Sequence, residues 1–314
     1  MSHEVETIAW AGTADDVPWH GLGTQCLPDL TPAQFQEKAG LDWTVEKIPA
    51  YATIDGKQVN IGKSALVRST DHRLLSVVSN DWNPLQNSEA FEFFNEFIEA
   101  GDMEMHTAGS LKQGELVWAL AKVKESFSLF KGKDVVDSYL LFTNPHKFGK
   151  AIDIRFTPTR VVCWNTISLA LSEASVNQTS ISHRVKFDKQ KVLDTLGMAS
   201  SKFSQYHEAA IALSQTKMPK EDVVAYFKRI FPVLTSKENS TREISKNAKL
   251  CLEILDTQPG AEFGRGTAWQ AFNAISYSVD HLLGRNDDTR TTSAWYNGGA
   301  QLKSRALNDI LELV

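Results

Sequence analysis

The sequence predicts an α+β fold with a central, largely antiparallel β-sheet, packed helices and a helical C-terminal half. Two observations predict it. Short runs typical of strands dominate the first part of the chain, and apolar residues at helical spacing dominate the last part. Apolar residues make up 42% of the 314 residues, enough for a substantial core. We expect a β-rich core with one or two helices over residues 1–191 and a helical region over 192–314, which the sequence allows to belong to the same domain.

In the first half, turn residues separate apolar runs that predict strands. These runs cover residues 58–69, 73–79, 114–123, 135–144 and 151–157. Between the second and third runs, residues 87–101 predict a core-packing helix. Asn87 can cap this helix, Phe91 and Phe94 share one apolar stripe, and Gly101 can end it.

After the fifth strand, the pattern changes from a period of two to a helical period. Pro158 predicts the end of the strand and Thr159 is a suitable cap, so residues 160–174 are expected to be helical. Arg160 and Asn165 would then lie on the early turns of this helix.

The second half predicts helices throughout. Residues 188–214 carry one apolar stripe, and residues 221–231 form a second helix behind Pro219. Two further helix starts fit the capping box, in which the cap hydroxyl and the third helical side chain satisfy each other's backbone donors. They are Ser240 with Glu243, and Thr267 with Gln270.

Charge and cysteine content argue against several classes of protein. The net charge of −5 disfavours a protein that coats nucleic acid over its whole surface. Cys26, Cys163 and Cys251 include no CxxC pair, so neither a disulfide framework nor a zinc knuckle is supported. The sequence contains no run of about 18 uncharged apolar residues, the length a membrane helix needs. We therefore expect a protein of the reducing cytoplasm with no membrane segment.

One segment of the chain is basic. Residues 141–191 carry 8 Lys and Arg against 3 Asp and Glu, whereas residues 1–140 carry 11 against 21 and residues 192–314 carry 14 against 14. Phosphate binding needs only a local groove of positive potential, so this segment is compatible with a track for nucleic acid on an acidic body. Chance clustering on a solvated face explains the same counts.

The main candidate site lies within this segment, at residues 142–166. Its polar members are Asn144, His146, Lys147, Lys150, Arg155, Arg160 and Asn165. Lys and Arg neutralise phosphates, and aromatic side chains such as Phe148 and Trp164 offer stacking faces to unpaired bases. The competing interpretation is that both aromatic side chains belong to the core.

Residues 182–187 extend the basic segment. Arg184 and Lys186 would lie on one face if these residues form a strand, and could lengthen the same track. An exposed β-edge protected from aggregation by its charges explains the pattern equally well.

A separate candidate anion site precedes one of the predicted helices. Its residues are Gly264, Arg265, Gly266 and Thr267. A helix N-terminus offers free N–H groups to an anion, although the spacing of a phosphate-binding loop is absent. A loop that enters a helix without any ligand is the competing interpretation.

An enzyme is not favoured. Cys163, His183 and Asn165 supply the residue types of a thiol nucleophile with its base and orienting group, but those types act only within hydrogen-bond reach. The apolar neighbours of Cys163 would leave a buried thiol inert. No array of carboxylates or histidines has the spacing of a metal site, so we expect no metal and no cofactor.

Several segments, taken in order, resemble a family of phage and plasmid-like proteins known as a domain of unknown function. They are WHGLG, QNSEAFEFF, LLFTNPHKFGKAI, TRVVCWNT, the pair His183-Arg184, and TAWQAFNAISYSVDH. The chain departs from the family pattern at Lys147 and Phe148, where an acidic residue and a glycine are expected.

The resemblance extends, more remotely, to Rad-type single-strand annealing proteins, which form rings or filaments around DNA. It implies a homo-oligomer in the host bacterial cytoplasm. The implied contacts to the DNA backbone are Lys147, Lys150, Arg155, Arg160, Arg184 and Lys186.

These observations lead to one functional hypothesis and one alternative. The hypothesis is a phage or mobile-element protein that binds single-stranded DNA and promotes strand annealing in recombination or replication. The alternative is a phage-encoded interaction or anti-defence protein that uses the basic cluster as a pocket for an anion, a nucleotide or a protein partner.

Overall fold

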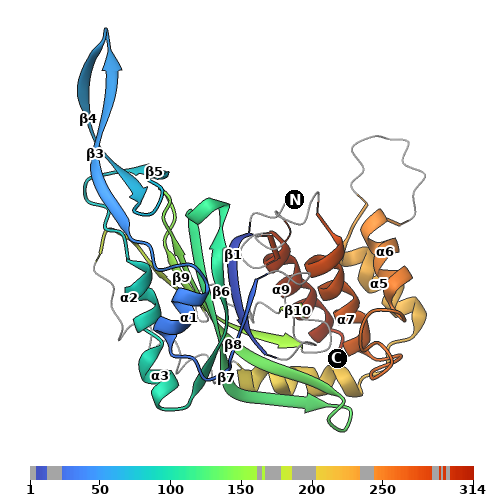
Figure 1. The fold of residues 1–314 in the computed structure, drawn as a ribbon. Helices are drawn as coiled ribbons and strands as arrows, with labels where there is room; N and C mark the ends of the chain where they lie inside the picture. The colour runs from blue at the N-terminus through green and yellow to red at the C-terminus, as the bar shows by residue number, and fades with distance from the viewer. Residues whose placement is uncertain are drawn as a thin grey trace. The chain divides into compact units, whose positions relative to one another are not determined.

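A computed structural model describes residues 5–12, 23–160, 165–166, 178–185, 203–233, 244–284, 290, 293–294 and 298–314. It is an α+β structure with a large, mainly antiparallel sheet, as predicted (Figure 1). The chain divides into two compact units. Unit 1 comprises residues 1–124, 139–155 and 178–196, and unit 2 comprises residues 125–138, 156–177 and 197–314. The boundary predicted at residue 191 stays a prediction, since residues 186–202 lie outside the described part.

The large sheet has the strand order β10-β9-β8-β7-β6-β1-β2, and β11 also pairs with β9. The strands are β1 Val5–Ala11, β2 Thr24–Cys26, β6 Met103–Leu111, β7 Leu116–Leu129, β8 Asp134–Pro145, β9 Ile152–Arg160, β10 Asn165–Thr166 and β11 Gln178–Ile181. The pairs β1–β6, β6–β7, β9–β10 and β9–β11 are antiparallel, and β1–β2 is parallel. The predicted strands at 114–123, 135–144 and 151–157 are confirmed as parts of β7, β8 and β9.

The helix predicted from residue 160 is wrong where the structure describes it. Strand β9 continues through Pro158 to Arg160, and Asn165 lies in strand β10. Pro158 is tolerated because β9 changes partner there: it pairs with β11 as far as Arg155 and with β10 from Thr159. Pro158 therefore belongs to neither the β11 nor the β10 ladder, and its missing N–H interrupts neither of these two.

Unit 1 also contains three short helices, α1 Pro32–Lys38, α2 Asn87–Glu92 and α3 Asn95–Glu99. The last two replace the single helix predicted over residues 87–101, and Phe91 and Phe94 are buried as expected. The cap is Gln86, whose side chain forms a capping box with Glu89. Asn87 does not cap the helix: its amide is buried and donates to the carbonyls of Leu41 and Trp43.

A second, three-stranded sheet of unit 1 has the order β3-β4-β5. Its strands are β3 Val45–Ile54, β4 Lys57–Arg68 and β5 Leu74–Val78. The strands predicted at 58–69 and 73–79 are confirmed, whereas β3 was missed. Asp55 and Gly56 join β3 to β4 with φ of 50° and 75°, the signature of the two-residue turn that suits a twisted hairpin. This hairpin extends well beyond β5 (Figure 1).

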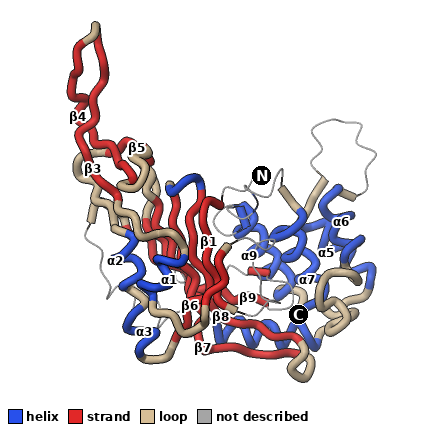
Figure 2. The backbone as a smooth tube through the Cα atoms, in the orientation of Figure 1, coloured by secondary structure: helices blue, strands red, loops and turns tan. Residues whose placement is uncertain are grey.

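Unit 2 is mainly helical in its described part (Figure 2). Its helices are residues 203–215, α5 Lys220–Ile230, α6 Lys246–Ile254, α7 Ala268–Tyr277, the π-helical turn η4 Ser278–Leu282 and α9 Gly298–Leu311. Helix α7 is the core of the unit, since its first nine residues are buried. Ser240 and Glu243, the predicted start of a helix, lie outside the described residues. Helix α6 begins at Lys246 with Ser245 as its cap. None of the described helices combines the length and apolar character needed to cross a membrane.

Candidate nucleic-acid interface

The centre of the predicted site is a turn at the end of β8, in unit 1. Residues 147–150 form this turn, with the Lys150 N–H donating to the Lys147 carbonyl at 3.2 Å. Gly149 adopts φ 76°, a left-handed conformation that favours glycine. Phe148 is 56% exposed, so its assignment to the core is wrong. Its N–H donates to Ser76 Oγ on β5 at 3.1 Å, which fixes the turn against the small sheet.

The turn is anchored by buried polar side chains just before it. Asn144 Nδ2 donates to the Leu85 carbonyl at 2.8 Å, and His146 Nε2 lies 3.2 Å from Asn87 Oδ1. Both Asn144 and His146 are fully buried. Asn144 Oδ1 and His146 Nδ1 have no hydrogen-bond partner among the described residues. The exposed, cationic turn is thus anchored by the buried side chains of Asn144 and His146, which form its base.

A second turn, residues 182–185, packs beside the first through His183. The imidazole stacks on Trp82 with ring centroids 4.0 Å apart, and its Nδ1 lies 3.2 Å from the Asn83 carbonyl. Residues 182–185 form a turn rather than a strand, because the Val185 N–H donates to the Ser182 carbonyl at 3.1 Å. The Asn83 N–H donates to the His183 carbonyl at 2.8 Å and joins this turn to residue 83. His183 is close enough to His146 to influence its charge, so the two turns are neighbours.

Both histidines are held neutral. Burial lowers the pKa of His146 to about 3, and the nearby His183 lowers it further. Burial also lowers the pKa of His183 to about 4, although the carbonyls of Asn83 and Pro145 oppose the shift. Desolvation penalises the imidazolium form, and among the described residues no carboxylate contributes to either shift. At neutral pH neither ring contributes charge, so the positive charge of this surface comes from Lys and Arg.

Most described cations of the predicted track already have carboxylate partners. Lys147 Nζ lies 2.6 Å from Glu115 Oε2, and Arg184 Nε lies 3.3 Å from Asp81 Oδ2. Arg155 pairs with Asp153, with its Nη2 donating to Oδ2 at 3.1 Å. The pairs of Lys147 and Arg184 are exposed, and such pairs are worth only about 0–1 kcal/mol. A phosphate can therefore compete for these two side chains.

Arg155 differs from the other cations because its side chain is only 19% exposed. Asp153 and Thr157, which alternate with the apolar residues of β9, are buried as well. Arg155 therefore lies in a largely covered layer beside its own carboxylate partner, Asp153. By contrast, Lys150 and Lys147 on the turn are exposed to solvent.

Three residues of the predicted track cannot be placed as side chains. Arg160 and Asn165 are described in their backbone, where they are register partners of β9 and β10 in unit 2. Lys186 and the proposed nucleophile Cys163 lie outside the described residues, as does most of the WHGLG segment. Among the residues that are described, no group of three or more side chains has the makings of a metal site.

In the candidate anion loop of unit 2, backbone N–H donors form hydrogen bonds within the same segment of the chain. Thr267 caps α7 as predicted, with its hydroxyl accepting from the Gln270 N–H at 3.4 Å. The Gln270 side chain, however, accepts from the Gly266 N–H at 2.7 Å rather than from Thr267. The Thr267 N–H donates to the Gly264 carbonyl, and Arg265 lies on the exposed side 4.0 Å from Asp256. This geometry fits a self-capped helix start better than an open anion site.

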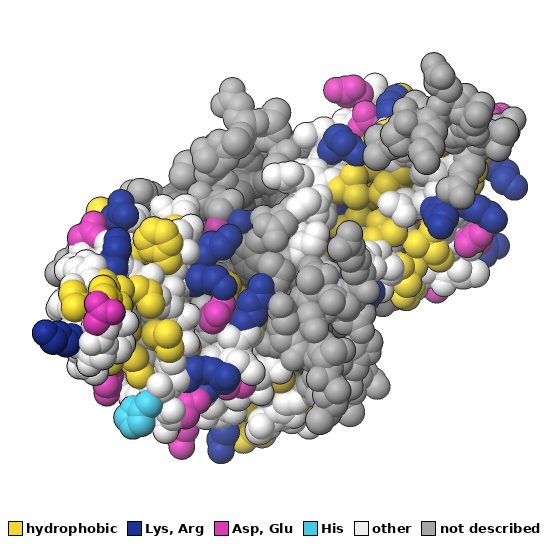
Figure 3. Space-filling model, turned by 90° about the horizontal axis from the view of Figure 1, so that it is seen from above, with side chains coloured by type: hydrophobic (Ala, Val, Ile, Leu, Met, Phe, Trp, Pro, Cys, Tyr) yellow, Lys and Arg dark blue, Asp and Glu magenta, His cyan; other side chains and the backbone are white. Residues whose placement is uncertain are grey.

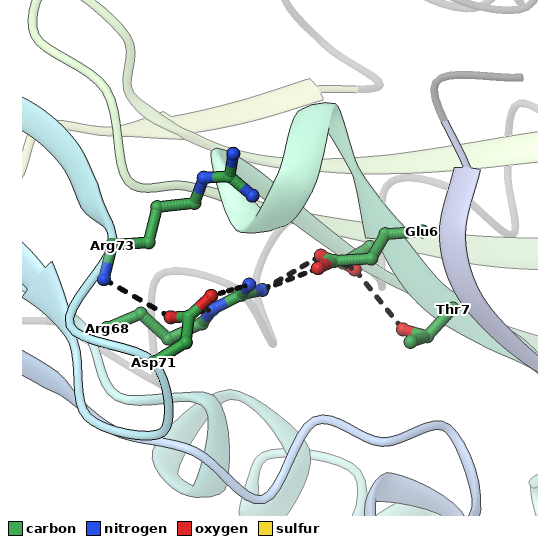
Figure 4. Close-up of polar contacts among 6 residues, drawn as sticks. Glu6, Thr7, Arg68, Asp71 and Arg73 are labelled. Atoms are coloured by element: carbon green, nitrogen blue, oxygen red, sulfur yellow. Dashed lines mark hydrogen bonds and ion pairs between the residues drawn. The ribbon is translucent and has the colours of Figure 1, made fainter. Parts of the chain in front are cut away.

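Sequence reasoning missed a buried arginine at the end of β4. Arg68 donates to both oxygens of Glu6 at 2.8 and 2.9 Å and to both oxygens of Asp71 at 2.9 and 2.6 Å (Figure 4). These hydrogen bonds raise its pKa and lower that of Asp71. The guanidinium lies 5.6 Å from the ring centre of Trp43, which contacts His146 edge-on. Arg68 therefore buttresses the base of the site.

The segment that carries these features matches a known protein family. The model described as Domain of unknown function (DUF932) matches residues 74–296. The chain belongs to this family. Comparison with curated proteins and with solved structures found no match. The DUF932 segment includes the turn at 147–150 and both buried histidines, and it begins after β3 and β4.

Proposed function

We propose that this protein binds single-stranded DNA on unit 1 and promotes the pairing of complementary strands. The observation that supports the proposal is the exposed ring of Phe148 between Lys147 and Lys150 on a rigid turn. Aromatic rings stack on unpaired bases of any sequence, and flanking cations hold the phosphates of the same strand. Arg184, on the neighbouring turn, extends the cationic surface by one more side chain.

The mechanism follows from the arrangement of these groups. The neutral base of Asn144, His146 and His183 keeps the two turns fixed, so little ordering is required when a strand binds. A strand held by stacking and phosphate contacts leaves its base edges free for a complementary strand. We place this activity in phage or mobile-element recombination or replication, in the host cytoplasm, in keeping with the resemblance to annealing proteins.

The experiment is a titration of a labelled single-stranded oligonucleotide, followed by fluorescence anisotropy. Phe148→Ala should weaken binding at least about 5-fold, because stacking contributes about 1–3 kcal/mol per base. Lys150→Ala should weaken binding and reduce the slope of log K against log salt by about 1. The matched controls are Leu27→Ala and Lys249→Ala, which remove an exposed apolar and an exposed cationic side chain elsewhere. Equal affinity of Phe148→Ala and wild type would refute the assigned surface.

The second candidate is an interaction or anti-defence protein that takes a small anion, a nucleotide or a protein partner. The pairing of the exposed Lys147 and Arg184 with carboxylates favours it, because such a surface offers alternating charges rather than a continuous positive groove. It predicts that the protein fails to bind the oligonucleotide at low salt. It also predicts that Arg155→Ala abolishes binding of the small ligand or partner.

A further inference from the structure

Asp81 lies shortly after the end of strand β5, next to two cations that come from other parts of unit 1. Its Oδ2 lies 3.3 Å from Nε of Arg184, on the neighbouring turn. Lys47, on β3, donates from Nζ to the carbonyl of Asn80 at 2.5 Å. The hydroxyl of Ser79 lowers the pKa of Asp81, and the charges of Arg184 and Lys47 lower it further. Asp81 is therefore ionised at neutral pH and acts on both cations.

The segment that leads to Asp81 also supports the stacking side chain of the proposed interface. Ser76 Oγ, on β5, accepts from the Phe148 N–H at 3.1 Å. The five residues from Ser76 to Asp81 span at most about 17 Å of chain. A stacked strand, with about 3.4 Å per nucleotide, covers this distance with about five nucleotides. One bound strand can thus contact Phe148 and the cations beside Asp81 at the same time.

Lys47 is a cation of this surface that lies outside the basic segment of the sequence. Its side chain is exposed, and its hydrogen bond to a backbone carbonyl holds it beside Asp81. A carbonyl does not neutralise an ammonium group, so Lys47 keeps its charge for another anion. Lys47 and Arg184 together therefore offer a strand two phosphate contacts next to Phe148.

Asp81 opposes these contacts. The side chains of Arg184 and Asp81 are 58% and 60% exposed, so a phosphate can take the place of the carboxylate. The displaced carboxylate stays within the site and repels the phosphate, because its distance is well below the screening length of about 10 Å. A like charge about 4 Å away in water weakens binding about 5-fold.

The same mixture of charges is visible on the surface of unit 1. In Figure 3, dark-blue Lys and Arg side chains on the left part of the molecule, which holds the β3-β4-β5 sheet, have magenta Asp and Glu side chains beside them. A strand that binds there meets carboxylates as well as cations.

We propose that the strand-binding surface of unit 1 extends past β5 to Lys47, and that Asp81 is a built-in competitor that weakens the grip on the strand. This inference rests on the proposed function. The weakening acts mainly on the dissociation rate, as most changes at one interface do. A protein that pairs complementary strands must release the duplex, and a carboxylate that competes with the phosphates speeds this release.

The test is a titration of labelled single-stranded oligonucleotide by fluorescence anisotropy with Asp81→Asn. This variant should bind about 3- to 10-fold tighter at low salt. The slope of log K against log salt should steepen by about 0.7, because Arg184 gains a phosphate. Glu253→Gln is the matched control, since it removes the carboxylate of an exposed pair with Lys249 in unit 2 and changes the net charge equally. It should bind like the wild type.

Two further variants separate the parts of the proposal. Lys47→Gln should weaken binding about 2- to 5-fold and reduce the salt slope by about 0.7. In an Arg184→Gln background, Asp81→Asn should tighten binding 2-fold or less, on the order of what a double-mutant cycle shows for coupled neighbours. An equal gain in both backgrounds, or a Lys47→Gln variant that binds like the wild type, would overturn the assigned contacts.

The outcomes distinguish this inference from the proposed function. A wild type that binds the oligonucleotide, with Asp81→Asn no tighter than Glu253→Gln, would overturn the inference and leave the proposed function standing. Binding by Asp81→Asn at a salt concentration where the wild type fails to bind would support both. Absence of binding by both proteins at low salt would overturn both.

Discussion

Acid should destabilise this protein well before its carboxylates are protonated, because two buried histidines must remain neutral in the folded state. The folded pKa values are about 3 for His146 and about 4 for His183, against an unfolded value of 6.5. Above pH 6.5 both states hold the rings neutral, and stability does not depend on them. Below pH 6.5 the unfolded chain binds protons that the folded chain refuses, so the free energy of unfolding falls as pH falls.

The magnitude follows from the width of this window. Each neutral histidine costs about 1.4 kcal/mol per pH unit below 6.5, so both together cost about 4 kcal/mol between pH 6.5 and 5.0. Typical domains have only about 5–15 kcal/mol of stability, so the loss is a large fraction of the total. The protein should therefore remain folded at pH 5 but unfold at a much lower urea concentration than at neutral pH.

Urea unfolding followed by circular dichroism at pH 7.5 and 5.0 measures this loss. His183→Gln should reduce the difference between the two pH values by about half, because one of the two histidines no longer titrates. The exposed His72 provides the control, and His72→Asn should leave the difference unchanged. Equal stability of the wild type at both pH values would refute the assignment of two buried neutral rings, as would an undiminished difference in His183→Gln. Should His183→Gln not fold, the wild-type histidine resonances give the same information by NMR titration.

Two further predictions concern local structure. Gly109→Ala should destabilise the protein by about 1–3 kcal/mol, because a Cβ at Gly109 would lie 2.2 Å from the Thr7 carbonyl oxygen and push β1 away from β6. Thermal unfolding measures this loss, with Gly298→Ala as the control, since a Cβ at Gly298 meets nothing within 4 Å. Equal melting temperatures of the two variants would contradict the close approach of Gly109 to Thr7. Thr267→Ala should cost about 1 kcal/mol through loss of the α7 cap, with Thr267→Ser close to wild type in the same assay. An unchanged Thr267→Ala would show that the Gln270 contacts suffice to start the helix.

Local patterns in the sequence predicted much of the fold. The apolar runs that became β4, β5, β7, β8 and β9 were recognisable because strand periodicity is a property of neighbouring residues. The cap of α7 was recognisable because Thr267 and its partner lie within one turn. Strand β3 was missed, although Asp55-Gly56 between two β-rich runs is a strong hairpin signal that could have found it.

The candidate site was only half predictable, because its electrostatics depend on distant parts of the chain. The sequence shows the cations of the basic segment, but their carboxylate partners lie far away in the chain: Glu115 pairs with Lys147, and Asp81 pairs with Arg184. No local pattern reports such a pairing. The convergence of His146 and His183 likewise depends on tertiary structure, although both residues were noted. The buried Arg68 lies outside the basic segment, where a count of charges draws no attention to it.

Addition of the complementary strand to a protein–oligonucleotide complex tests the central claim most directly. The complex is formed at low salt with labelled single-stranded DNA, and duplex formation is followed by fluorescence in wild type and in Phe148→Ala. We expect salt-sensitive binding and faster pairing with the wild type than without protein, and a much smaller acceleration with Phe148→Ala. Absence of binding by the wild type at low salt, or pairing no faster than for free strands, would contradict the proposal that this protein handles single-stranded DNA.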